Sequence, residues 1–240
     1  MFVGFKVYDS TAFNFYQPLL DRVDFIEVMA AKDRDYSFLK GAGQPVVIHN
    51  MHYGFGVNFA NGRLYEVNKA SLELSLMLAD RVNAKTVIIH PERVEDSACS
   101  EDNIAALLSE YDDKRIIIES MPYSAGGFRF YAYDRDSIKR LTSRLGCGLC
   151  LDFAHSSEAA RKLGMDLVGF ISEINSLKPR HYHISDTKVE TGRDMHMHLG
   201  VGDLPLEEFK KLIPKNARVT VETPHDDMEK ALSDVRFLKG

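Results

Sequence analysis

The sequence has little cysteine, no long apolar run and no excess of positive charge, and each shortage excludes a class of protein. Three cysteines in 240 residues argue against a disulfide framework and fit a reducing cytoplasm. No apolar run approaches the roughly 20 residues of a membrane helix, and the N-terminus lacks the pattern of a signal peptide. The formal charge is -5, so nucleic-acid binding would need a local basic patch. We therefore expect a cytoplasmic protein with no membrane contact.

Short β-branched or apolar runs alternate along the chain with longer amphipathic stretches. We expect strands over 2–7, 24–29, 45–50, 85–90, 115–120, 147–152, 180–185 and 218–223. Helix-like segments between them include 65–82, 157–177 and 226–239, and Asp136 and Ser157 occupy expected N-cap positions. This α/β repeat predicts a single-domain (β/α)8 TIM barrel over residues 1–240. The alternative is an open doubly wound sheet, but no Gly-x-Gly-x-x-Gly motif follows the first strand.

Histidines and carboxylates gather where the third to eighth predicted strands end. In a barrel of this kind the active site lies at the C-terminal ends of the strands. The residues concerned are His49, His52, His90, Glu119, Asp152, His155, His183, Asp186, Asp194, His196, His198 and Glu222. So many imidazoles and carboxylates on one rim would be costly to desolvate without cations. The pattern therefore predicts a multinuclear metal site, with nitrogen and oxygen ligands that suit Zn²⁺, Mn²⁺ or Fe²⁺.

Two other motifs carry less information. Cys147-x-x-Cys150 lies inside a predicted strand, where residues three apart point to opposite faces, and this argues against a redox or zinc pair. Gly200-Val201-Gly202 is typical of a tight turn, with a phosphate cradle as the alternative.

A series of short motifs follows in an order that fits the barrel. The series is His52-Tyr-Gly-Phe55-Gly-Val-Asn58, His90-Pro91, Glu119, Asp152-Phe-Ala-His155, His183-Ile-Ser-Asp186-Thr-Lys188, Asp194-Met-His196-Met-His198-Leu-Gly200-Val-Gly202 and Glu222-Thr-Pro224. Taken together it resembles the endonuclease IV family (AP endonuclease family 2), within the xylose isomerase-like TIM barrel superfamily. The resemblance spans about residues 24–224.

The resemblance implies a trinuclear zinc site and a reaction. The first ion would be held by His52, His90 and Glu119, the second by Glu119, Asp152, His183 and Glu222, and the third by His155, Asp194 and His196. Glu119 would bridge two ions, and Glu119 and Glu222 would be catalytic. The implied activity is phosphodiester hydrolysis in DNA at abasic sites with about two to three Zn²⁺ ions, Mn²⁺ being the alternative.

The sequence departs from the family pattern where the family contacts DNA. Lys6-Val-Tyr-Asp-Ser-Thr replaces a Ser-x-Gly-Gly turn, and Phe55, Gly56 and Met195 replace a tyrosine, a larger apolar residue and an arginine. We nevertheless expect nucleic-acid contacts from Arg34, Tyr36, Phe55 and Lys188. The basic side chains predicted on the rim are Lys32, Arg34, Arg63, Arg129, Lys188 and Arg193. They form either a phosphate-tracking patch or an ordinary set of solvated charges.

Two other functions remain open. A sugar isomerase or epimerase of the same superfamily would need one metal, held by Glu119, Asp152, His183 and Glu222, and would act on a small sugar or sugar phosphate. It has no evident need for His52, His90, Asp194 and His196 together. A barrel that keeps its metal ligands without catalysing a reaction is the third hypothesis.

Overall fold

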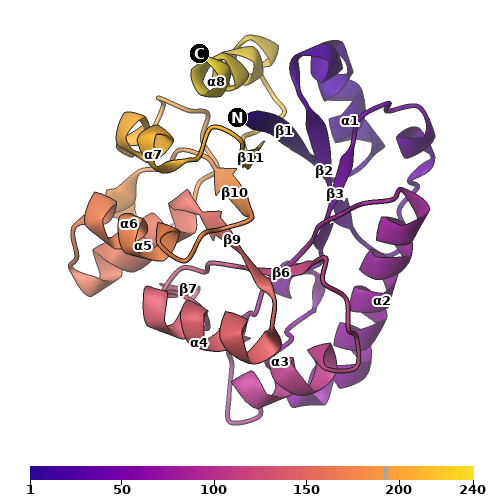
Figure 1. The fold of residues 1–240 in the computed structure, drawn as a ribbon, viewed down its shortest axis with the longest axis vertical. Helices are drawn as coiled ribbons and strands as arrows, with labels where there is room; N and C mark the ends of the chain where they lie inside the picture. Colours follow the sequence, from indigo (N-terminus) through magenta and orange to yellow (C-terminus); the bar gives the residue numbers. More distant parts are fainter. Residues whose placement is uncertain (192–193) are drawn as a thin grey trace.

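The computed structural model describes residues 1–191 and 194–240, and its centre is a closed barrel of parallel strands (Figure 1). The barrel strands are β1 (Phe2–Val7), β2 (Phe25–Ala30), β3 (Val46–Asn50), β4 (Val87–Ile89), β6 (Ile116–Glu119), β9 (Gly148–Asp152), β10 (His181–Ile184) and β11 (Arg218–Val221). Each strand pairs with its neighbour in sequence, and β11 closes on β1. Every predicted strand has its counterpart, so the TIM barrel prediction is confirmed.

Helices surround the barrel on its outside (Figure 1). They are α1 (Ser10–Tyr16), α2 (Tyr65–Arg81), α3 (Glu101–Leu108), α4 (Arg135–Leu145), α5 (Phe153–Leu163), α6 (Leu167–Asn175), α7 (Leu206–Leu212) and α8 (Met228–Lys239). Short 3-10 helices occur as η1 (Gln17–Arg22), η2 (Ser37–Lys40), η3 (Tyr53–Phe55), η4 (Gly62–Leu64) and η5 (Val189–Thr191). Among the residues described, no helix has the length and apolar character needed to cross a membrane.

The caps of α4 and α5 differ from the sequence prediction. The N-cap of α4 is Asp134, which forms a capping box with Ser137, so the assignment to Asp136 is wrong. The expected helix over 157–177 is two helices, because Gly164 ends α5 in a left-handed conformation with φ 67°. Asp152 rather than Ser157 caps α5, and its Oδ1 accepts a 2.7 Å hydrogen bond from the His155 backbone N–H. The end of β9 and the start of α5 are therefore fixed by one carboxylate.

The interior of the barrel has two layers that follow from the two-residue period of its strands. Phe25, Val47, Ile88, Ile117 and Cys150 pack into one buried cluster, which we call the apolar layer. Two positions further along each strand, the side chains again face the barrel axis. These residues are Lys6, Glu27, His49, His90, Glu119, Asp152, His183 and Glu222, and we call them the polar layer. The polar layer lies at the C-terminal ends of the strands.

A small antiparallel sheet stands at the same end of the barrel. It consists of β5 (Arg93–Val94), β8 (Phe128–Phe130) and β7 (Ser124–Ala125), which come from the segments following β4 and β6. The Arg93 guanidinium lies 4.4 Å from the ring centre of Tyr53 and 4.4 Å from that of Phe128. This contact ties the segment after β3 to the small sheet beside the polar layer.

Candidate metal centre

Glu119, at the end of β6, is the carboxylate around which the polar layer is arranged. Its Oε2 lies 3.1 Å from His49 Nε2, 3.2 Å from His90 Nε2 and 3.2 Å from His183 Nδ1. Its other oxygen, Oε1, lies 3.1 Å from His155 Nδ1. Burial opposes the charge of Glu119, yet His90, His183 and His155 hold its pKa well below the usual value. One carboxylate with imidazoles on both oxygens has the arrangement of a shared ligand.

Three histidines each present a free ring nitrogen to a carboxylate. His49 Nδ1 lies 2.7 Å from the Asn50 carbonyl, His155 Nδ1 3.1 Å from the Ser120 carbonyl, and His196 Nδ1 3.1 Å from the Glu222 carbonyl. A carbonyl only accepts, so Nδ1 donates in each case, and Nε2 is the ring nitrogen that faces the carboxylate. Metal-ligating histidines are oriented in this way by an acceptor on the other nitrogen. This orientation suits the three side chains to metal binding.

His183, on β10, is oriented by a carboxylate instead. Its Nε2 lies 3.0 Å from Glu27 Oε2, which also accepts a 2.6 Å hydrogen bond from the Thr220 hydroxyl. Its Nδ1 lies 2.8 Å from Glu222 Oε1 and 3.8 Å from Asp152 Oδ2, with no well-aligned hydrogen bond among the described residues. A buried nitrogen between two carboxylates, without a bond of its own, fits a metal ligand. The structure therefore places His183 beside Glu222, with Glu119 at 3.2 Å and Asp152 at 3.8 Å.

Asp194 joins the two histidines of the third expected group. Asp194 Oδ2 lies 3.0 Å from His196 Nε2 and 3.6 Å from His155 Nε2. This oxygen is also buried without a hydrogen bond among the described residues. His196 Nδ1 lies 3.7 Å from Glu222 Oε2, so the third group adjoins the second.

The carboxylates of the centre crowd one another in a way that cations would relieve. Burial, together with the nearby Glu119, Asp194 and Glu222, raises the pKa of Asp152 to about 7. Bound divalent ions would stabilise the ionised form of these carboxylates, which otherwise repel one another. Nitrogen and oxygen donors of this kind suit zinc or manganese. The donor set, its orientation and its unpaired atoms all fit bound metal.

Two candidate histidines lie at the end of β3, His49 within the strand and His52 just after it, and the structure distinguishes them. His49, His90 and Glu119 form a group whose ligand atoms lie within 4.8 Å of one another. His52 stacks on His90 at 5.5 Å between ring centres and accepts a 3.2 Å hydrogen bond at Nδ1 from the Gly54 N–H. Burial and the neighbouring His90 and His49 lower its pKa to about 2, so its ring stays neutral. In this tautomer Nε2 of His52 carries the proton, whereas Nε2 of His49 faces Glu119 Oε2 at 3.1 Å.

The centre opens into a cavity of about 480 Å³. Lys6, His90, Glu119, His155, Asp194, His196 and Glu222 line its floor and wall, and Ser124 to Gly126 and Phe130 line the side of the small sheet. Glu158 also lines the cavity, and burial raises the pKa of its carboxyl. A volume of this size accommodates one small ligand or one nucleotide unit.

The loop that carries Asp194 and His196 is held by Asp186 and His198. Asp186 Oδ2 accepts 2.9 Å hydrogen bonds from the N–H groups of Gly200 and Gly202. A side chain on Gly202 would clash with Asp186 and the Thr187 carbonyl, so the glycine turn cradles a carboxylate of the chain itself. His198 Nδ1 lies 2.6 Å from Asp234 Oδ2, which anchors the loop to α8.

The residues expected to contact nucleic acid lie in different environments. Phe55 and Lys188 are exposed. Arg34 donates to the Tyr8 carbonyl at 3.0 Å and to Asp9 at 2.8 Å. Tyr36 is buried, and its hydroxyl bonds to backbone atoms of Met29 and Ala31, so it holds the segment after β2 in place.

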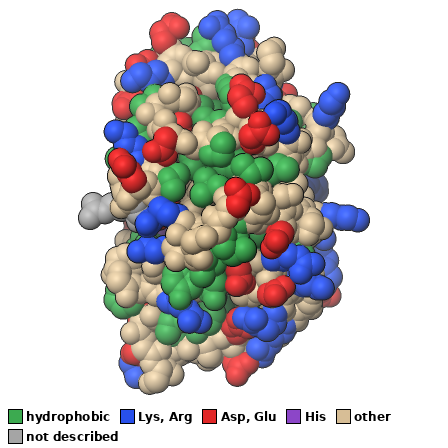
Figure 2. Space-filling model, turned by 90° about the vertical axis from the view of Figure 1, so that its left-hand side faces the viewer, with side chains coloured by type: hydrophobic (Ala, Val, Ile, Leu, Met, Phe, Trp, Pro, Cys, Tyr) green, Lys and Arg blue, Asp and Glu red, His purple; other side chains and the backbone are tan. Residues whose placement is uncertain are grey.

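The remaining basic side chains of the rim include Lys32, Arg63 and Arg129, which are exposed, while Arg193 lies outside the described residues. Arg63 is paired with Asp96 at 2.7 Å. On the flank formed by α5, α6 and α7, acidic and basic side chains are interspersed (Figure 2).

Sequence reasoning missed the supporting residues Lys6, Glu27 and Glu92. Glu92 is buried with φ 72°, accepts a 3.1 Å hydrogen bond from the Tyr53 N–H and lies 3.6 Å from His90 Nδ1. Burial raises the pKa of its carboxyl well above the usual value. Lys6 and Glu27 were detectable, because each stands two residues after an inward-facing residue of its strand.

The closed parallel barrel defines the protein as a TIM barrel. Groups of histidines and carboxylates that could hold metal ions lie at the C-terminal ends of its strands. The chain belongs to the xylose isomerase-like TIM barrel family, whose model matches residues 13–240.

Relatives and solved structures agree with this membership. The probable endonuclease 4 of Mycobacterium leprae (strain Br4923) is 28% identical over 217 residues, which cover 85% of this chain and 82% of the relative. The resemblance to endonuclease IV is thereby confirmed. The fold matches a D-tagatose 3-epimerase-like protein with a TM-score of 0.78 at 17% identity, over 100% of this chain and 96% of that one. It also matches endonuclease IV from Thermus thermophilus with a TM-score of 0.72 at 18% identity, over 100% and 98% of the two chains.

Proposed function

We propose that the chain is a cytoplasmic, zinc-dependent phosphodiester hydrolase that cleaves DNA at abasic sites. The observation that carries this proposal is the third ligand group, in which Asp194 Oδ2 lies 3.0 Å from His196 and 3.6 Å from His155. A single-metal isomerase would not need this third group. In phosphodiester cleavage, by contrast, several ions stabilise the attacking and the leaving oxygens. The relatives named probable endonuclease 4 support the same choice.

Each ligand group has a distinct part in the proposed centre. His49, His90 and Glu119 hold the first ion, and the oriented Nε2 favours His49 over His52 for this position. The second ion falls to Glu119, Asp152, His183 and Glu222, and the third to His155, Asp194 and His196. When bound, the ions would supply Lewis acidity and activated water. The total is about two to three ions per chain.

The chain's own residues orient and enclose the reacting phosphate. Glu119 and Glu222 fix the relative positions of the ligand groups, because Glu119 contacts four histidines and Glu222 contacts two. His52, half-buried beside His90, lines the cavity with a neutral ring that can donate from Nε2. The small sheet with Phe130 restricts water access from one side.

We propose that binding to intact duplex is weak. Phe55 is 41% exposed and could stack on a base, but Gly56 beside it adopts φ 78° and has no side chain to fill a gap in the duplex. Met195 is exposed where the family tends to have a phosphate-binding arginine. Extruding a nucleotide costs a few kcal/mol, and these residues offset that cost poorly. Frayed, gapped or single-stranded abasic DNA should therefore be the better substrate.

An incision assay tests the proposal. A labelled oligonucleotide with an abasic analogue would be offered as single strand, gapped duplex and intact duplex, with and without chelator. We expect chelator-sensitive incision, faster in the first two contexts. Glu119→Gln should be inactive in all of them, while Lys215→Ala, on the opposite end of the barrel, should match wild type.

The second candidate is a single-metal sugar isomerase or epimerase. Glu119, Asp152, His183 and Glu222 would hold its ion, and the cavity of about 480 Å³ is of a size for one sugar or sugar phosphate. A parallel ketose–aldose and epimer interconversion assay separates the two proposals. Chelator-sensitive sugar interconversion without incision of any DNA would replace the hydrolase by this candidate.

A further inference from the structure

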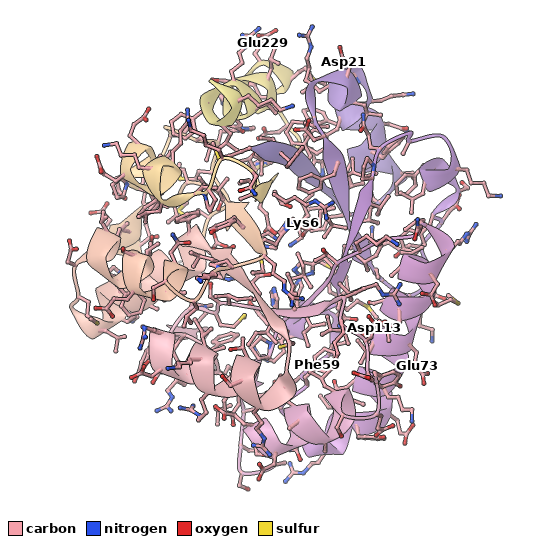
Figure 3. All side chains as sticks on the ribbon, viewed as in Figure 1. Lys6, Asp21, Phe59, Glu73, Asp113 and Glu229 are labelled. Atoms are coloured by element: carbon pink, nitrogen blue, oxygen red, sulfur yellow. The ribbon has the colours of Figure 1, made fainter. Side chains whose placement is uncertain are left out.

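Lys6 places a buried cation inside the barrel. It is the fifth residue of β1, its side chain is 6% exposed, and Figure 3 shows it within the ring of strands. Its Nζ lies 2.6 Å from Glu222 Oε1 and 3.6 Å from Glu27 Oε1. An ammonium is strongly hydrated, so burial is tolerable only with such partners. Lys6 is therefore an integral part of the polar layer.

The partners of Lys6 belong to a set of donors that would suit a metal ion. One atom each of Glu27, His49, His183 and Glu222 lies within 4.8 Å of the others, and all four residues are buried. Glu27 Oε1 accepts no hydrogen bond among the described residues, although it is fully buried. The Lys6 ammonium lies 3.6 Å from this oxygen and also contacts Glu222. This set, which we call the inner group, thus has a positive charge beside it already.

We propose that the Lys6 ammonium takes the place of a metal ion in the inner group and so limits how many ions the centre binds. Two carboxylates with one ammonium leave a single net negative charge, where the bare group would carry two. A divalent ion in the inner group would also bind His49, His183 and Glu222, which the outer ions share with Glu119. By balancing Glu27, Lys6 leaves these three ligands available to the catalytic centre.

Counting bound metal ions tests this inference on the whole 240-residue chain. Lys6→Ala removes the charge and opens space, and we expect it to bind about one more Zn²⁺ per chain than wild type at saturation. The count comes from equilibrium dialysis with Zn²⁺ and elemental analysis. Diffraction at the zinc absorption edge should place the added ion among Glu27, His49, His183 and Glu222. An equal or lower count in Lys6→Ala, or an added ion elsewhere, would overturn the inference.

Three further variants separate charge from space. Lys6→Met removes the charge but fills the space, so it should not gain the ion. Glu27→Gln combined with Lys6→Ala removes one of the two carboxylates, so the gain should disappear, and Lys215→Ala should count as wild type. If Lys6→Ala folds only with zinc present, the inference is supported. If it fails to fold even with zinc while Lys6→Met folds, Lys6 serves packing alone and the inference is wrong.

The test compares the number of zinc ions bound by Lys6→Ala and by wild type, so it does not depend on DNA incision. A wild-type chain that incises no DNA would count against the proposed hydrolase and would leave the expected difference between Lys6→Ala and wild type intact. An unchanged count would remove the role of Lys6 and leave the hydrolase standing.

Discussion

The apolar and polar layers of the barrel interior are built by the same strands, two residues apart. In the apolar layer, side chains such as Val47, Ile88 and Ile117 stabilise the fold by leaving water, and they need no particular partner. In the polar layer, His49, His90 and Glu119 lose hydration and are tolerable only because they contact one another. The N-terminal side of each strand therefore carries stability, and the C-terminal side carries the candidate centre.

The contrast is incomplete on β10 and β11. There the positions level with the apolar layer are His181 and Thr220, and both lie close to Glu27 Oε2, at 3.2 Å and 2.6 Å. Polar character thus reaches deeper into the barrel beneath His183 than elsewhere. This is the side on which Lys6 and Glu27 pair, so the exception marks the support of the second ligand group.

Glu119→Gln should break the polar layer with the largest effect. The amide keeps the shape but cannot supply a second anionic oxygen to the histidines around it. We expect occupancy to fall at the first and second ion positions together and incision to fall by about 1,000-fold. Elemental analysis and single-turnover incision measure the two effects. Loss of only one ion would show that Glu119 is not shared.

Ile117→Ala, two residues earlier on β6, should affect stability and leave the metal count unchanged. The side chain is buried in the apolar layer, and its truncation leaves a cavity. We expect the free energy of unfolding to fall by about 2–5 kcal/mol. Denaturant unfolding of the metal-free protein gives the first quantity, and zinc analysis of the folded variant gives the second. A reduced zinc count would mean that the two layers are not separable.

His49→Ala and His52→Ala sharpen the boundary of the polar layer on the third strand. His49 belongs to the layer and directs its Nε2 at Glu119, whereas His52 lies beyond the strand with Nδ1 accepting from the Gly54 N–H. We expect His49→Ala to weaken the first ion by about 100-fold and His52→Ala to change it by less than about threefold. Zinc titration against a competing chelator would measure both. The reverse order would restore His52 as the ligand, as the sequence motif predicted.

The fold was predictable because the barrel strands are nearly continuous apolar runs with regular spacing. Runs such as 85–90 and 115–120 could hardly be anything but buried strands, and β4 and β6 lie within them. The limits of helices were less predictable, since Asp134 and Asp136 are equally good cap residues and only the backbone conformation selects Asp134.

The candidate site was predictable at strand ends and less so in the segments that follow. His90, Glu119 and Asp152 are placed by the strand itself, and the structure brings them together as expected. His52 was predicted from its distance in sequence to Asn58, whereas the histidine of β3 that faces the barrel axis is His49, so the choice between them stays a prediction. The inward positions of Lys6 and Glu27 were not predicted because lone charges near the N-terminus carry no motif, although the two-residue period points both side chains inward.

His196→Ala should have the smallest effect on stability while still removing an ion. The side chain is 43% exposed on the rim, and alanine adopts the backbone φ of 45° at a modest cost. The free energy of unfolding should therefore change by no more than about 1 kcal/mol. The third ion should be lost, because Asp194 and His155 alone offer too few ligands. Turnover should then fall by about 10-fold to 100-fold with little change in KM, since the ion is proposed to act on the leaving group. His155→Ala should give the same loss of metal from a more buried position. A large drop in melting temperature with the zinc count unchanged would instead make His196 a structural residue. The metal centre would then be confined to the polar layer and would not include this residue of the rim.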